Sequence, residues 1–148
     1  MDNNYWNQDE LIEATEGELK EHLKYEIDMF RETCRQLNLS QKTLFERNLL
    51  LESLPTHIRI LTNFFYGEKK YCNDLVAQDF LPSSVDWASE RLPQTELLND
   101  AKNKADKQLA HLSRWRVKIE KDNKKGWEWA EIGDDIEKVI QKFENLRR

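Results

Sequence analysis

Apolar side chains recur every three or four residues along four separate stretches of this chain, and this spacing constrains the fold more than any other feature. Such a period places the apolar side chains on one face of an α-helix. The first stretch shows it at Leu19, Leu23, Ile27, Phe30, Cys34 and Leu37. The 148 residues include only 4 Gly and 3 Pro, whereas an all-β chain needs turn residues every ~8–12 positions. The sequence therefore predicts an all-α protein.

The limits of the periodic stretches predict four helices. We expect them at about residues 8–37, 40–66, 95–119 and 129–146. Ser40 can cap the second helix through its hydroxyl, and Gly67 ends that helix. Pro55 lies in the middle of the second helix and lacks a backbone N–H, so we expect a kink or a break between Leu51 and Pro55.

The connection between the second and third helices, residues 67–94, has no sustained period. Structureless loops longer than ~12–15 residues are uncommon in compact domains, so we expect a long ordered loop or a short helix here. Four amphipathic helices of this length pack most simply as an antiparallel four-helix bundle. A length of 148 residues fits one domain, residues 1–148.

The cysteines and the distribution of apolar residues predict a cytoplasmic protein. Cys34 and Cys72 are too few for a disulfide framework, and we interpret them as free thiols in a reducing compartment. The chain has no run of ~20 apolar residues and does not start with the pattern of a signal peptide, so no membrane partner is expected. No His-x-x-His or Glu-x-x-His pair occurs, so we expect neither a metal nor a cofactor.

Charge is distributed unevenly along the chain. Residues 1–32 contain ten acidic and three basic residues, a net charge of −7, and residues 101–125 contain nine basic and three acidic residues, a net charge of +6. The basic segment could bind the phosphate backbone of a nucleic acid. Alternatively, the two segments are neighbouring helices whose charges attract each other, or simply solvated faces. The net charge of the whole chain, −5, disfavours unaided attraction of nucleic acid.

Polar residues on the apolar faces are the candidate functional residues. Arg116 lies about 40° from Leu112 on the third predicted helix, inside the apolar stripe, and a buried guanidinium needs a carboxylate partner. We expect that partner among Asp74, Asp79 and Glu52. His111 and Lys104 lie along one flank of the same helix.

In the second predicted helix, His57 lies close to the apolar stripe and Arg59 points away from it. The two histidines and the arginine of the third helix could therefore meet near one seam. One interpretation is a metal-independent ribonuclease, in which His111 acts as base or acid and Arg116 or Lys104 stabilises the charged phosphorane. The other is that both histidines donate hydrogen bonds inside the core and that Arg116 forms a structural ion pair.

Three segments also support a family resemblance. They are Glu52-Ser53-x-x-x-His57-x-Arg59-x-Leu61-x-x-Phe64-Phe65, then Asp74-x-x-Ala77-x-Asp79-Phe80, then Asn103-Lys104 ahead of Ala110-His111-Leu112-Ser113-x-x-Arg116. They resemble a bacterial family of small α-helical proteins and are similar in arrangement to the HEPN superfamily of helical bundles. That resemblance implies a helical bundle, often dimeric, whose active members are ribonucleases with an Arg-x(4–6)-His motif.

The chain departs from that motif, because no arginine stands four to six residues before His57 or His111. Lys104 is separated from His111 by six residues and is preceded by Asn103. This departure disfavours catalysis more than it disfavours the fold.

We therefore expect a HEPN-like binding or assembly module that self-associates, linked to RNA or to a toxin–antitoxin or defence system. The alternatives are a metal-independent endoribonuclease using His111 and a protein–protein adaptor with no nucleic-acid role. The candidate residues are His111, Arg116 and Lys104 for catalysis, and His57, Arg59, Asp74, Asp79 and Asn103 for binding.

Overall fold

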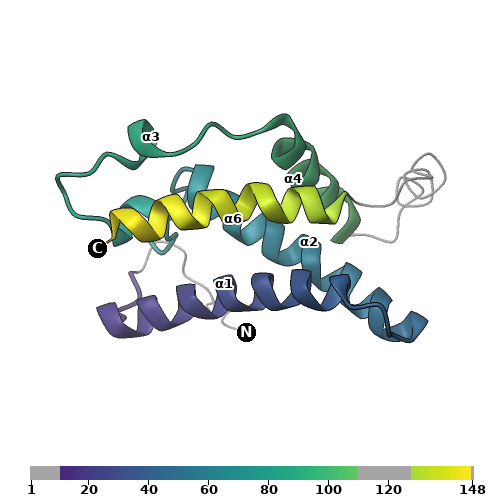
Figure 1. The fold of residues 1–148 in the computed structure, drawn as a ribbon. Helices are drawn as coiled ribbons and strands as arrows, with labels where there is room; N and C mark the ends of the chain where they lie inside the picture. Colours follow the sequence, from purple (N-terminus) through teal and green to yellow (C-terminus); the bar gives the residue numbers. More distant parts are fainter. Residues whose placement is uncertain (1–10, 110–127, 148) are drawn as a thin grey trace.

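The computed structural model describes residues 11–109 and 128–147, and these residues form helices and no strand (Figure 1). The elements are α1 (Glu16–Asn38), α2 (Leu44–Tyr66), the 3₁₀ helix η1 (Ala77–Phe80), α3 (Trp87–Glu90), α4 (Glu96–Leu109) and α6 (Trp129–Leu146). The all-α prediction is confirmed. The predicted end of the third helix, near Ile119, lies outside the described residues.

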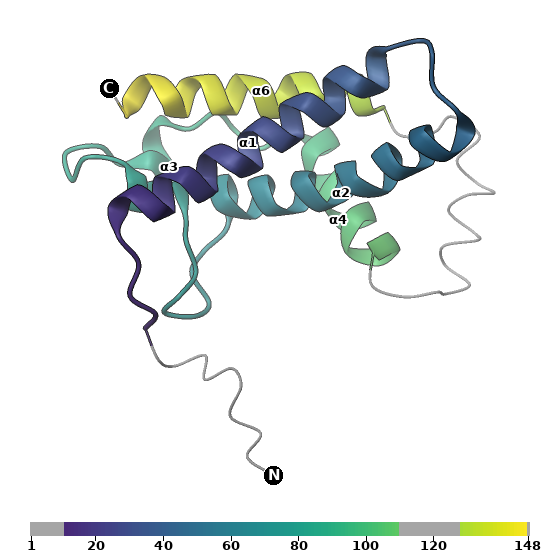
Figure 2. The ribbon, with the colours of Figure 1, turned by 90° about the horizontal axis from the view of Figure 1, so that it is seen from below.

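The long helices pack as a bundle in which neighbours mostly run in opposite directions (Figures 1 and 2). α1 is antiparallel to α2 and to α6, and Arg31 of α1 reaches both Glu137 and Glu144 of α6. α4 runs back along the C-terminal half of α2, where Arg59 and Asp106 meet. In both views α4 is steeply inclined to α6. This arrangement leaves the outward face of α2 between α1 and α4.

Threonine capping boxes fix the beginnings of α1 and α2. The Thr15 hydroxyl accepts a hydrogen bond from the Glu18 backbone N–H, and the Glu18 carboxylate accepts one from the Thr15 backbone N–H. Thr43 and Glu46 form the same pair of bonds at the start of α2. Each box satisfies two backbone donors that a helix start leaves without partners. α1 therefore begins at Glu16 rather than near Gln8, and the predicted cap at Ser40 is wrong because Thr43 caps α2.

α2 is continuous through Pro55, so of the two predicted outcomes, a kink or a break, the break does not occur. A proline inside a helix costs about 3 kcal/mol through a lost hydrogen bond and a steric clash. Leu54, Ile58 and Leu61 on the same helix are almost fully buried. Each fully buried side chain of this kind contributes about 1.5–3 kcal/mol, so their burial together outweighs the cost of the proline.

The connection between α2 and α4 is ordered and contains two short helices, η1 and α3, which confirms the prediction for this segment. Trp87 donates from Nε1 to the Phe65 carbonyl at 2.7 Å, and Arg91 donates to the same carbonyl at 3.0 Å. Tyr66 donates its hydroxyl to the Leu92 carbonyl at 3.0 Å. The first two bonds satisfy the Phe65 carbonyl near the end of α2, and all three hold the connection against the bundle.

An aromatic cluster forms the core where α2, α6 and the connection meet. Phe143 of α6 lies 5.6 Å from Phe64, 5.5 Å from Phe65 and 5.7 Å from Trp87, measured between ring centroids. The three contacts have edge-to-face geometry, which the charge distribution of aromatic rings favours. Phe143 is fully buried. The cluster gives the C-terminal half of α2 a rigid support.

Candidate functional site

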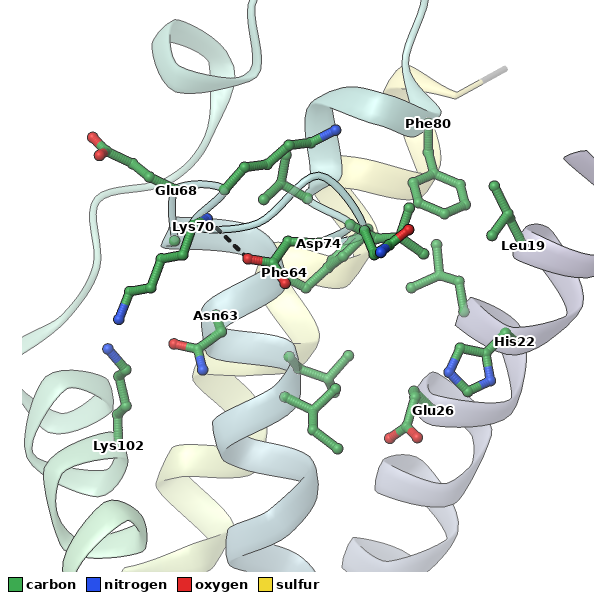
Figure 3. Close-up of a pocket in the computed structure, with 18 residues that line it drawn as sticks. Leu19, His22, Glu26, Asn63, Phe64, Glu68, Lys70, Asp74, Phe80 and Lys102 are labelled. Carbon is green, nitrogen blue, oxygen red and sulfur yellow. Dashed lines mark hydrogen bonds between the residues drawn. The ribbon is translucent and has the colours of Figure 1, made fainter. Parts of the chain in front are cut away.

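An open trough of about 700 Å³ lies over the outward face of α2, and we call it the α2 trough (Figure 3). It is bounded by α1 from Leu19 to Glu26, by α2 from Ile60 to Gly67, by residues 68–76, and by Lys102 of α4 and Phe80 of η1. Its volume is within the range of ligand sites in proteins, about 300–1,000 Å³. Five elements of the chain therefore build one concavity.

The floor of the trough is apolar and firmly supported. Phe64 is 7% exposed and packs edge-on against Phe80 at 5.5 Å between ring centroids. Ile60, one turn earlier on α2, is 40% exposed and faces the trough. Because Phe64 also contacts the aromatic cluster, the floor cannot shift without disturbing the core.

A tight turn closes one end of the trough. A Cβ on Gly67 would lie 2.4 Å from the Asn63 carbonyl oxygen, so only glycine lets the chain leave α2 this closely. Asp74 then accepts hydrogen bonds from the backbone N–H groups of Lys70 at 2.8 Å and Tyr71 at 3.0 Å. These two bonds, with Tyr71 the stronger cause, hold the pKa of Asp74 below its usual value. Asp74, a predicted binding residue, therefore lies in the trough and orders the turn that positions Lys70.

Two lysines face each other at the α4 side of the trough. In Figure 3 the side chains of Lys70 and Lys102 point toward one another, and the Asn63 amide points to the same corner. Neither ammonium forms an ion pair with any residue that the structure describes. We call these three residues the lysine corner.

Lys69, the residue before Lys70 in the sequence, does form an ion pair. Lys69 lies 2.7 Å from Asp79, measured from Nζ to Oδ1. Asp79 also accepts a hydrogen bond from the Val76 backbone N–H at 2.9 Å and thereby caps η1. Asp79, another predicted binding residue, thus has a role in holding the connection together.

The opposite flank of the trough includes a histidine–carboxylate pair. Nδ1 of His57 lies 2.9 Å from Oε2 of Glu26, and the two side chains are only 9% and 13% exposed. Glu26 borders the trough, and His22, one turn earlier on α1, borders it as well. His57 does not line the trough. The pair links α1 to α2, and no spacing pattern predicts the partnership because Glu26 lies 31 residues from His57.

The other predicted residues lie apart from the trough or outside the described residues. Arg59 pairs with Asp106 at 2.7 Å on the surface between α2 and α4. On α4, Asn103 is exposed and Lys104 half-buried, and neither lines the trough. His111 and Arg116 lie outside the described residues, as does any contact between Arg116 and its predicted acidic partners.

Two other kinds of site are absent from the described ranges. Residues 11–109 and 128–147 contain no group of three or more His, Cys, Asp or Glu side chains placed to hold a metal ion. Over the same part of the chain, no helix combines the length and the apolar character needed to span a bilayer. Neither a family model, nor a curated protein sequence, nor a solved structure matches the chain. The candidate site therefore depends on the geometry of the α2 trough.

Proposed function

We propose that this chain is a HEPN-like helical module for binding and assembly, which works in the cytoplasm and holds an apolar segment of a protein partner in the α2 trough. Amphipathic segments bind grooves of this kind by laying their apolar face on the groove floor. The HEPN resemblance supports a place in a toxin–antitoxin or defence assembly. The chain has only two cysteines, too few for a disulfide framework, which supports a reducing compartment.

The trough itself is the observation that carries this proposal. Its floor exposes apolar side chains such as Ile60, although the bundle beneath them is well packed. Apolar surface gains about 25 cal/mol per Å² when it is removed from water, so a partner that covers this floor gains affinity. The rim of charged and polar groups then fixes how the partner lies.

The charges around the trough favour a protein partner over RNA. Three carboxylates border it, those of Glu26, Glu68 and Asp74, together with three lysines. A nucleic-acid backbone carries a negative charge at every phosphate and would be repelled at three positions along this rim. A peptide with mixed charge can match both signs, so we place a protein segment in the trough.

The endoribonuclease alternative has a separate test. Purified chain and its His111→Ala variant are incubated with single-stranded RNA under metal-free conditions. We expect no cleavage by either protein. Cleavage by the parent that the variant lacks would replace the binding proposal with the enzyme.

The same resemblance adds self-association to the proposal, and sedimentation equilibrium tests it. A dimer at micromolar concentration supports this part of the proposal. A monomer throughout the measured range contradicts it and leaves the trough proposal unchanged.

A peptide titration tests the trough directly. The ¹⁵N-labelled chain is titrated with a synthetic amphipathic helix of about four turns that has leucines on one face and glutamates beside them. We expect amide shifts at residues 60–76 and saturation in the micromolar range. Ile60→Ser should weaken binding about tenfold, since it removes apolar contact.

The matched control is Leu49→Ser. Leu49 is an apolar residue of α2 that is 51% exposed and lies outside the trough. Its substitution should leave the affinity unchanged. Shifts spread over the whole chain, or equal losses in the two variants, would contradict binding in the trough.

A further inference from the structure

We infer that the lysine corner, Lys70, Lys102 and Asn63, is a carboxylate-binding site, so that the partner segment presents an acidic side chain beside its apolar one. This inference rests on the proposed function, because it names the chemistry of the segment that the α2 trough holds. Three separate parts of the chain supply the corner: the turn after α2, α4, and the last turn of α2.

The arrangement of the two lysines is the main argument. Their side chains point toward one another across the α4 side of the trough (Figure 3). Two like charges that approach each other repel, and the repulsion is relieved when an anion lies between them. No carboxylate of the described residues forms an ion pair with either one. Asp74 attracts Lys70 without forming an ion pair with it, so the two lysines together keep an excess of positive charge that an anion can balance.

The cations around the corner show that pairing is the usual outcome in this part of the fold. Lys69 pairs with Asp79 at 2.7 Å, and Arg59 pairs with Asp106 at 2.7 Å. Lys69 is the sequence neighbour of Lys70, and Arg59 lies one turn before Asn63 on α2. The two lysines of the corner depart from this pattern, because neither forms an ion pair with a described residue.

The backbone beneath the corner is held in place before any ligand arrives. The Lys70 N–H donates to Asp74, and Gly67 fixes the exit from α2. Lys102 is half-buried on α4, between the buried residues Ala101 and Ala105 of the same helix. A site with a fixed backbone loses less entropy on binding than a flexible one.

The Asn63 side chain adds a neutral hydrogen-bonding group. Its amide can donate to a carboxylate that the two ammoniums already attract. Glu68 and Asp74 also line the trough and would repel a chain of phosphates, whereas one carboxylate fits between two lysines. The chemistry therefore favours a single acidic side chain of a protein segment.

Three peptides test the inference. They share one amphipathic helical sequence and carry Glu, Gln or Lys at the position beside the leucine anchor. Affinities for the intact chain are measured by calorimetry, and the trough is followed by NMR. We expect the Glu peptide to bind about tenfold more tightly than the Gln peptide and to weaken as salt is raised.

Charge reversal provides the decisive variant. The double substitution Lys70→Glu with Lys102→Glu should invert the order, so that the Lys peptide binds best. Lys104→Glu is the matched control, because Lys104 is a half-buried lysine of α4 that does not line the trough. It should leave the order of the three peptides unchanged.

The outcomes separate this inference from the proposed function. If the Glu and Gln peptides bind equally with shifts in the trough, the carboxylate site is wrong and the trough proposal stands. If no peptide shifts residues of the trough, the trough proposal is wrong as well. Tighter binding of single-stranded RNA than of the Glu peptide, abolished by the charge reversal, would overturn the inference in favour of a nucleic-acid ligand.

Discussion

α1 borders two charged regions that have opposite characters. On the side of α1 that faces α6, Arg31 donates two hydrogen bonds to the Glu137 carboxylate, from Nε at 2.9 Å and from a terminal nitrogen at 2.8 Å. Arg31 also lies 3.4 Å from the Glu144 carboxylate. We call this contact, together with Cys34 and Gly133, the α1–α6 seam. Across the other face of α1 lies the α2 trough, where Lys70 and Lys102 face each other with no ion pair to a described residue.

The difference separates charges that stabilise the fold from charges that remain available to a ligand. The bidentate pair in the seam joins two helices that are 106 residues apart in sequence, and its charges neutralise each other. The two lysines of the corner form no ion pair with a described residue. Substitutions in the seam should therefore lower stability, whereas substitutions in the corner should change binding alone.

The largest expected loss of stability follows from a substitution in the aromatic core, which supports both regions. Phe143→Ala removes a fully buried ring that contacts Phe64, Phe65 and Trp87. We expect the free energy of unfolding to fall by about 3–5 kcal/mol. Urea denaturation followed by circular dichroism measures it. A loss below about 1 kcal/mol would mean that the cluster does not support the trough floor.

Substitution in the histidine–carboxylate pair should cause the second largest loss in the free energy of unfolding. Glu26→Ala leaves the buried His57 without its partner, and an unsatisfied buried polar group costs about 1–3 kcal/mol. The double variant Glu26→Leu with His57→Phe removes both polar groups and should recover most of the loss. If Glu26→Ala proves neutral in the same denaturation experiment, the pair is not a structural link between α1 and α2.

The pair at the seam should have a smaller effect, since its side chains are 37% and 31% exposed. The hydrogen bonds that Arg31 donates to Glu137, the larger cause, and to Glu144 raise the pKa of Arg31, so the guanidinium stays charged. Arg31→Ala should lower the free energy of unfolding by about 1 kcal/mol after allowance for solvent screening. Lys24→Ala is the surface control, because its pair with Asp28 is more exposed, and it should change little. Equal effects of the two substitutions would remove the distinction between seam and surface.

The smallest effect on stability concerns Cys34 at high pH. Burial, followed by the nearby charges of Glu137 and Asp134, raises the pKa of the Cys34 thiol from 9.0 to about 11. A raised pKa in the folded state stabilises the protein below pH 9 and loses that contribution as the pH rises toward 11. Between these values the parent should lose up to about 1 kcal/mol more than Cys34→Ala. Parallel pH dependences of the two proteins would contradict the burial of this thiol.

Local patterns predicted the helices and their buried faces. Leu23, Ile27, Phe30 and Leu37 of α1 are all buried, as the period of three and four requires. α6 begins at Trp129 and ends at Leu146, as its spacing predicts. Two capping boxes were present in the sequence as Thr15-x-x-Glu18 and Thr43-x-x-Glu46, and they mark the starts of α1 and α2 better than the apolar period does.

The candidate site could not be predicted from the sequence in the same way, because residues from distant parts of the chain form it. Lys70 lies in an aperiodic segment and Lys102 on the face of a helix 32 residues later, so no spacing rule joins them. Asp74 and Asp79 were predicted as binding residues, and in the structure Asp74 accepts hydrogen bonds from the backbone of Lys70 and Tyr71, whereas Asp79 pairs with Lys69. Lys102 belongs to a segment whose positive charge the sequence did show.

A paired measurement on one variant tests the central claim most directly. Lys70→Ala with Lys102→Ala is compared with the parent by urea denaturation and by titration with the Glu peptide. We expect the free energy of unfolding to change by no more than about 0.5 kcal/mol, while the affinity for the peptide falls about tenfold or more. A loss of stability above about 1 kcal/mol with unchanged affinity would show that the lysine corner serves the fold and not a ligand.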